Sequence, residues 1–155
     1  MDKGSVFIAK IRFKRDPNSK IKPRQFIVIM KNEENVFFLE TEKTINKAKF
    51  NVNNRAKTEM YYHILTKVEN EENGFKLPTA INCREVFKCD YFPELLRLKH
   101  REISLNLIQQ VIEKVNHVRL SELNYADVYV TKKQLLLHNP KLRDNNKDTQ
   151  AQISL

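Results

Sequence analysis

Apolar and polar residues alternate along much of the N-terminal half of the chain, and this period of two predicts β-strands. In residues 5–13, SVFIAKIRF, the alternation places Phe7, Ala9, Ile11 and Phe13 on one face. A β-hairpin is predicted from two apolar runs, RQFIVIMK and NVFFLETE, which are joined by the short polar segment KNEEN.

The middle of the chain has less regular patterns. Residues 60–68, MYYHILTKV, predict another strand, followed by an acidic turn, ENEENGF. Residues 78–92 alternate enough to form one strand or a bent pair of strands. The basic, asparagine-rich residues 43–57 are compatible with either a strand or a long loop.

The clearest helix begins at Ser104, whose side chain is a suitable N-cap. Its apolar stripe has helical spacing and comprises Leu107, Ile108, Val111, Ile112, Val115 and Val118. A second helix is predicted over residues 131–137. From His138 onward the apolar period is lost, so we expect residues 138–155 to form a polar, flexible tail.

Together these elements predict an α+β fold in a single domain over residues 1–137. Many short strands with basic connections indicate a small, strongly curved, SH3-like β-barrel or half-barrel, with the C-terminal helix packed on the sheet. The pattern lacks long βαβ units, which argues against a doubly wound sheet.

Composition is that of a soluble protein, since 41% of the 155 residues are apolar and 30% are charged. No segment approaches the roughly 20 apolar residues of a membrane span, and the N-terminus turns to charge too early for a signal peptide. We therefore expect a cytoplasmic protein without a membrane partner. Cys83 and Cys89 lack the spacing of a metal or redox site and are expected to be ordinary, semi-buried thiols, and no cofactor is expected.

The charge balance carries more functional information. Lys and Arg number 28 against 19 Asp and Glu, which gives a net charge of +9. A positive field concentrates polyanions, so nucleic acid is the expected partner. A merely lysine-rich soluble protein would have the same balance, and that alternative stays open on charge alone.

Common enzyme motifs are missing from the sequence, among them the glycine-rich phosphate loops, the nucleophile elbow and the zinc-binding helix motif. RNA cleavage without a metal is still chemically accessible, because the RNA 2′-hydroxyl can attack its neighbouring phosphate. The protein must then align the reacting oxygens, move protons and stabilise the extra negative charge.

Three residues at the ends of the predicted hairpin suit that last task. Arg24 begins the first strand, while Thr41 and Lys43 follow the second, and antiparallel pairing brings these ends together. An arginine fork matches two phosphate oxygens, a lysine adds a compact charge, and a threonine hydroxyl can donate a hydrogen bond. Ordinary strand-end charges would have the same spacing, so a phosphate cradle is one of two interpretations.

The N-terminal pattern resembles a known family. KGSVFIAKIRF, a basic loop and then KPRQFIVI are similar to the opening of the MazF/PemK-type endoribonuclease toxins, which have a glycine-led strand, a loop and a Lys-x-Arg-Pro motif. Gly4 matches the glycine, and Lys22 and Arg24 match the basic pair. Gln25 stands where the family has proline, and Glu40 stands where a second hydroxyl is expected. A carboxylate at Glu40 would repel a phosphate unless it turned away or acted as a base.

The chain also resembles the related ToxN-type toxins, including the CptN branch, whose antitoxin is an RNA. Thr41-Glu42-Lys43 is similar to their Thr/Ser-x-Lys segment, and AINCREVF to one of their later strands. The resemblance implies a toxin that cleaves single-stranded RNA without a metal and leaves a 2′,3′-cyclic phosphate. It also implies a cognate antitoxin, with an RNA favoured over a small acidic protein, and an oligomeric antitoxin complex.

Within this interpretation Arg24 and Lys43 stabilise the phosphate charge and Thr41 orients the phosphate. His63 is the candidate for proton transfer, because its unperturbed pKa is near neutrality, although a buried, hydrogen-bonded histidine is the alternative. Tyr61 could stack on an unpaired base, and the remaining histidines are expected at the surface. The residues expected to attract the strand are Lys10, Arg12, Lys14, Arg15, Lys20 and Lys22. A non-catalytic, small-barrel nucleic-acid-binding protein is the main alternative function.

Overall fold

The computed structural model describes residues 1–13, 15–121 and 124–143. Its strands are β1 Ser5–Ala9, β2 Arg24–Lys31, β3 Asn35–Lys43, β4 Tyr62–Ile64, β5 Thr79–Asn82, β6 Glu85–Asp90, β7 Lys99–Glu102 and β8 Ala126–Val130. Its α-helices are α1 Arg55–Thr58, α2 Lys67–Glu72, α3 Leu105–Leu120 and α4 Lys132–His138. Short 3₁₀ turns are η1 Ala48–Phe50, η2 Val52–Asn54, η3 Pro93–Leu98 and η4 Pro140–Leu142.

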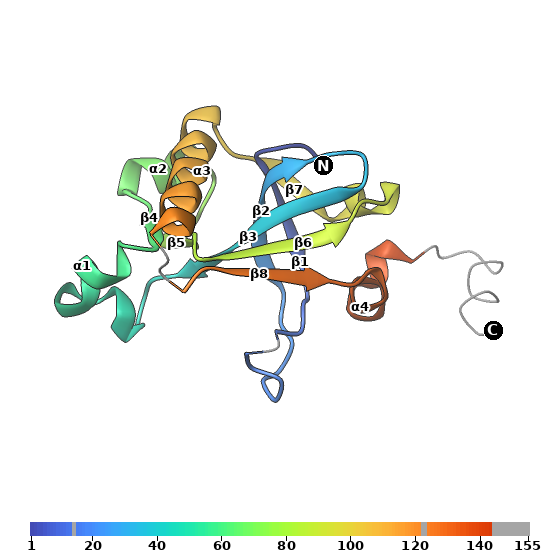
Figure 1. The fold of residues 1–155 in the computed structure, drawn as a ribbon, viewed down its shortest axis with the longest axis horizontal. Coiled ribbons are helices and arrows are strands. Elements are labelled where there is room, and N and C mark those ends of the chain that lie inside the picture. The colour runs from blue at the N-terminus through green and yellow to red at the C-terminus, as the bar shows by residue number, and fades with distance from the viewer. Residues whose placement is uncertain (14, 122–123, 144–155) are drawn as a thin grey trace.

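The eight strands form one mainly antiparallel sheet with the order β4-β5-β3-β2-β1-β7, while β6 pairs with β3 and β8 pairs in parallel with β6 (Figure 1). Helix α3 packs on this sheet, which confirms the predicted α+β class and the helix on the sheet. The pairings between described strands leave β4, β7 and β8 with one partner each, so the sheet is not closed into a barrel.

The predicted hairpin is confirmed, because β2 and β3 pair antiparallel with Phe26 opposite Glu40 and Ile27 opposite Leu39. Alternation sends Phe26 to one face and Ile27 to the other, and both are fully buried. The sheet therefore has a hydrophobic core on each face. One core stacks the rings of Phe7, Phe26, Phe38 and Phe87 beside η3, α4 and η4. The other packs Ile27, Leu39 and Ile81 against α3.

Helix α3 begins where the sequence predicted. The Ser104 side chain accepts a hydrogen bond from the Leu107 backbone N–H at 3.2 Å, which satisfies one of the free donors of the first turn. Of the predicted apolar stripe, Ile112 is half-buried and the other five residues are buried. Helix α4 follows a second cap, Thr131, so the second predicted helix is also confirmed.

Strand β3 is shared between two partners along its length. Its first half, Asn35 to Phe38, pairs with β6, and its last residues, Thr41 to Lys43, pair with β5. Strands β5 and β6 are separated by a corner at Cys83 and Arg84, so residues 78–92 form the bent pair. This arrangement brings together the polar start of β2, the polar end of β3 and the start of β5.

Two predicted strands are shorter than expected. The first ends at Ala9, because the Lys10 backbone pairs with the Asn139 side chain instead of a neighbouring strand, although Ile11 and Phe13 beyond it are buried. The strand predicted over residues 60–68 covers Tyr62–Ile64, and the acidic turn after it is helix α2. Residues 43–57 form the last residue of β3 and then short helical turns.

Helix α2 forms because Thr66 and Glu69 make a reciprocal capping box with each other's backbone N–H groups. The sequence contains that Thr-x-x-Glu signal directly after an apolar segment. The alternating pattern of residues 60–68 continues past Thr66, but the capping box at Thr66 and Glu69 ends the strand and starts the helix.

The expected tail is also wrong in its first residues. Asn139 and Leu142 are buried, and the first core includes Leu142, so the packed chain reaches Arg143. The remainder of the predicted tail, 144–155, lies outside the described residues. Within the described part of the chain, no helix is both long and apolar enough to cross a membrane.

Both cysteines are buried and free, Cys83 at the corner after β5 and Cys89 in β6. Burial raises the pKa of each thiol to about 12, so neither is a thiolate near neutral pH. Both are more deeply buried than the ordinary semi-buried thiols that the sequence predicted.

Candidate functional site

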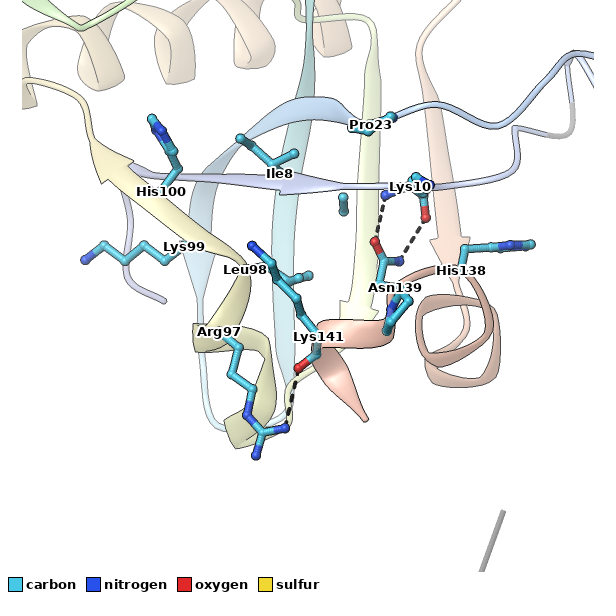
Figure 2. A pocket seen from close by; sticks show the side chains of 12 residues that line it. Ile8, Lys10, Pro23, Arg97, Leu98, Lys99, His100, His138, Asn139 and Lys141 are labelled. Atoms are coloured by element: carbon cyan, nitrogen blue, oxygen red, sulfur yellow. Dashed lines mark hydrogen bonds between the residues drawn. The ribbon is translucent and has the colours of Figure 1, made fainter. Parts of the chain in front are cut away.

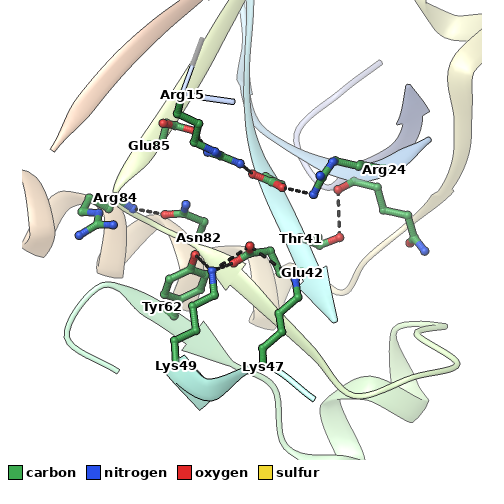
Figure 3. A network of polar contacts seen from close by, with 12 residues as sticks. Arg15, Arg24, Thr41, Glu42, Lys47, Lys49, Tyr62, Asn82, Arg84 and Glu85 are labelled. Atoms are coloured by element: carbon green, nitrogen blue, oxygen red, sulfur yellow. Dashed lines mark hydrogen bonds and ion pairs between the residues drawn. The ribbon is translucent and has the colours of Figure 1, made fainter. Parts of the chain in front are cut away.

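Glu40 lies near the end of β3 and is fully buried. Its two oxygens accept hydrogen bonds from different arginines: Arg15 Nη2 lies 2.6 Å from Oε2, and Arg24 Nη1 lies 2.8 Å from Oε1 (Figure 3). Arg15 also pairs with a second carboxylate, Glu85, so the two arginines and two glutamates together carry no net charge. The Glu40 carboxylate, which the sequence suggested would repel a phosphate, is neutralised by its two arginine partners.

The guanidinium groups of both arginines pack over the ring of Phe13. The guanidinium carbons of Arg15 and Arg24 lie 4.3 Å and 5.1 Å from the centre of its ring. Arg15 also contacts Glu85. Burial alone would lower the pKa of Arg15, but the hydrogen bond and charge of Glu40 outweigh it, so the pKa is raised and the group stays charged.

A second ion-pair group extends this network along β3. Lys49 Nζ lies 2.9 Å from both oxygens of Glu42 and 3.0 Å from the Tyr62 hydroxyl, and Lys47 Nζ lies 3.7 Å from Glu42 (Figure 3). Burial opposes the charged form of Glu42, yet the Tyr62 hydroxyl and the two lysines hold its pKa below the usual value. Burial and the neighbouring Glu42 raise the pKa of Tyr62, so this phenol keeps its proton.

Thr41 and Lys43 lie on the opposite face of β3 from Glu40. Thr41 pairs with Ile81 of the α3 core, whereas Glu40 pairs with Phe26 of the other core. The Thr41 hydroxyl donates to the Gln25 carbonyl at 2.9 Å, so that proton is already engaged. The expected three-residue cradle is therefore divided between the two faces of the sheet.

A cavity of about 630 Å³ nevertheless joins these residues. Arg24, Thr41 and Lys43 all line it, as do Glu42 and Lys47 of the polar network. Its positively charged lining residues are Lys22, Arg24, Lys43, Lys47, Lys76 and Arg101. Glu42 is the single carboxylate among its described lining residues, so the cavity presents a strongly positive surface.

Arg101, in β7, is a cation that the sequence analysis missed. Its Nε donates to the Asn73 carbonyl at 2.8 Å and its Nη1 donates to Gln25 Oε1 at 2.9 Å, while the guanidinium lies 4.5 Å from the centre of the Phe75 ring. Its Nη2 is buried without a hydrogen-bond partner in the described structure, and no carboxylate of that structure pairs with it.

Gly74 allows Arg101 to take this position. Its φ of +74° favours glycine, and a Cβ there would lie 2.8 Å from Arg101 Nε. Gln25, which departs from the family pattern, supplies one of the arginine's acceptors. Neither relation could be found from the sequence, because both depend on the approach of β2, β7 and the end of α2.

His63 and Tyr61 lie outside this cavity. His63 Nε2 is 3.1 Å from Glu69 Oε2 and its side chain is 16% exposed, so the geometry favours the hydrogen-bonded structural alternative. Tyr61 is half-buried beneath the Arg84 guanidinium, 4.0 Å from its ring centre. The histidine that lines the cavity is His100, whose Nδ1 accepts from Arg101 Nη1 at 3.1 Å.

The other expected RNA-binding residues are dispersed. Lys22 lines the large cavity, Lys20 is exposed, and Arg12 bonds the Ser19 carbonyl. Lys10 lines a second, smaller cavity, and Lys14 lies outside the described residues.

Comparison with protein-family models found no match, and comparison with curated proteins found none at the threshold applied. In the described part of the chain, no three His, Cys, Asp or Glu side chains are placed to hold a metal ion together.

Proposed function

We propose that this protein is a metal-independent endoribonuclease of the MazF/ToxN-like toxin superfamily, which cleaves single-stranded RNA by attack of a 2′-hydroxyl on the adjacent phosphate. The observation that carries the proposal is the pair of guanidinium groups, Arg15 and Arg24, which are held together by the buried Glu40 and of which Arg24 lines the basic cavity.

Each arginine uses one nitrogen on Glu40, and Arg15 uses its Nη1 on Glu85 as well. Both side chains retain solvent exposure, 41% for Arg15 and 23% for Arg24. Two neighbouring cations repel each other, and the shared carboxylate offsets that repulsion. The remaining N–H groups are available to a phosphate whose negative charge increases in the transition state. Both Glu40 oxygens are occupied and buried, so we assign Glu40 to positioning the arginines and not to proton transfer.

The lysines of the cavity have a different role. Lys22 and Lys43 are exposed and carry no ion pair in the described structure, so they are free to contact the RNA backbone on either side of the cut. Thr41 fixes β3 against β2 through Gln25. In this proposal it supports the site and does not touch the phosphate.

The proposal extends to fold and partner. We interpret β3, which pairs with β6 along its first half and with β5 at its end, as part of an SH3-like half-barrel. We expect the toxin to act on RNA in the cytoplasm. A toxin requires a neutralising antitoxin. An RNA antitoxin is favoured because the same positive cavity would hold its backbone, with an acidic protein segment as the alternative.

Incubation of the purified protein with single-stranded RNA of varied sequence in excess EDTA tests this function. Arg24→Ala should lower the cleavage rate by about 100-fold or more, the usual loss for one donor to a developing oxyanion. Arg24→Lys should recover only part of the rate, because lysine keeps the charge but lacks the fork. Lys133→Ala, an exposed lysine of α4 outside the network, is the matched control and should cut like the parent.

The outcomes separate the two functional classes. RNA that is bound but stays intact across all sequences would favour the non-catalytic nucleic-acid-binding protein. Cleavage by Arg24→Ala at the parental rate would overturn the assigned site, and thermal unfolding of each variant distinguishes loss of chemistry from loss of fold.

A further inference from the structure

A second cavity, of about 290 Å³, lies between the end of β1, the η3–β7 segment and the α4–η4 segment (Figure 2). The residues that line it and bear on the argument are Ile8, Lys10, Lys99, His100, Asn139 and Lys141. Its described lining contains four lysines or arginines and no carboxylate. Apolar atoms of Ile8, Leu98 and Pro140 complete the wall.

Two of the lysines that line this cavity form no ion pair with a carboxylate of the described structure. Lys10 and Lys141 are exposed, and neither forms an ion pair within the described structure. Lys99, by contrast, pairs with Glu102 at 2.6 Å. Lys10 and Lys141 are therefore the groups most available to an anionic ligand.

The cavity is held in shape by hydrogen bonds across it. Asn139 is buried; its Oδ1 accepts from the Lys10 N–H at 2.8 Å and its Nδ2 donates to the Lys10 carbonyl at 2.9 Å (Figure 2). Arg97 Nη1 donates to the Lys141 carbonyl at 3.4 Å. These bonds join three segments that are distant in the sequence, so the site exists before a ligand arrives.

The two cavities adjoin. Ile8, Pro23 and His100 line both of them, so the two basic cavities meet at these three residues. A chain molecule that occupies the large cavity and continues past His100 enters the small one. A single-stranded polyanion with a charge on every unit fits such a continuous surface.

We propose that the second cavity is a nucleotide subsite for the same RNA strand. Lys10 and Lys141 bind a phosphate one or more nucleotides from the cut, and the apolar wall of Ile8, Leu98 and Pro140 contacts the base or sugar. The inference rests on the proposed function in taking RNA as the ligand. The inference also states in which direction the RNA strand runs from the arginines, towards Lys10 and Lys141.

Fluorescence anisotropy with a single-stranded oligoribonucleotide whose 2′-oxygens are methylated tests the subsite, because methylation prevents cleavage and leaves binding measurable. The variants are Lys10→Ala/Lys141→Ala and, as a control of equal type, Lys3→Ala, an exposed lysine outside both cavities. For single strands each lost phosphate contact lowers the slope of log K against log salt by about 0.7. Because the two lysines share one phosphate in this proposal, the double variant should lose about 0.7 from the slope, and Lys3→Ala should keep the parental slope.

The same variants, assayed for cleavage, separate this inference from the proposed function. A reduced slope in the double variant supports the subsite even if the parent never cleaves RNA. An unchanged slope overturns it, whether or not the parent is a nuclease. Binding of polyglutamate that is lost in the double variant while RNA binding is unchanged would also overturn it, and would assign the cavity to an acidic peptide.

Discussion

Glu40 and its two arginines set the chemistry of the site at the scale of single residues. A buried carboxylate is costly unless it is paired, and here each oxygen has its own charged donor. The arrangement also keeps two guanidinium groups side by side without a net increase in repulsion. We infer that Glu40 is retained for the positions it gives to Arg15 and Arg24.

Replacement of Glu40 by Gln should lower the free energy of unfolding by about 2–4 kcal/mol, because two cations are left beside a neutral group. Chemical denaturation at neutral pH measures the change. Glu33→Gln, an exposed glutamate of the β2–β3 turn, is the control and should change stability by less than about 0.5 kcal/mol. Equal effects of the two substitutions would show that the Glu40 pairing contributes nothing.

Glu42 provides a test by pH. Its pKa is lowered from 4.5 in the folded protein, so its charged interactions stabilise the fold above pH 4.5 and are lost as the pH falls through the lower, folded value. The difference in unfolding free energy between the parent and Glu42→Gln should therefore be largest above pH 4.5 and shrink below it. A difference that stays constant on acidification would contradict the Lys49 and Lys47 pairing.

Single residues were predictable where local sequence determines their place. Arg24 at the start of β2 and Lys43 at the end of β3 were located correctly, and both line the cavity. Arg24 and Lys43 lie on opposite faces of the sheet because side chains alternate along β2 and β3, and this alternation could be read from the sequence. Arg101 could not be found in this way, because its neutral acceptors come from distant segments.

At the scale of elements, the spacing of hydrophobic residues predicted the long strands and helix α3. The residues at which the elements begin and end are set by capping side chains and by hydrogen bonds to distant segments. β1 stops at Ala9 because Asn139, far along the chain, takes the hydrogen bonds of Lys10. The same asparagine explains why residues 138–143 are packed despite their polar composition. A polar residue can anchor a segment as firmly as an apolar one when both its amide groups are bonded.

Asn139→Ala should lower the unfolding free energy by about 2–4 kcal/mol, since it leaves the Lys10 N–H and carbonyl without partners. It should also weaken RNA binding through the second cavity, because Lys10 and Lys141 lose their common anchor. Thermal unfolding and anisotropy measure the two effects. Asn53→Ala, an exposed asparagine in η2, is the control, and a loss no greater than the control's would refute the anchoring role.

At the scale of the whole molecule, the net charge of +9 is unevenly distributed. Six lysines or arginines line the large cavity and four line the small one, with a single carboxylate among the described linings of both. Composition predicted a polyanion partner but could not locate the surface, because the residues that form it come from β1, β2, β3, β7 and the C-terminal segments. The fold gathers these lysines and arginines in two cavities that adjoin at Ile8, Pro23 and His100.

The chemistry of the RNA ends after incubation in excess EDTA tests the central claim most directly. Attack by the 2′-hydroxyl predicts 5′ fragments that end in a 2′,3′-cyclic phosphate, and it predicts that a 2′-O-methyl group at the cut position blocks cleavage there. Both are read by mass spectrometry of the products. Fragments with 3′-hydroxyl ends, cleavage that persists at the methylated position, or RNA that remains intact would contradict the account.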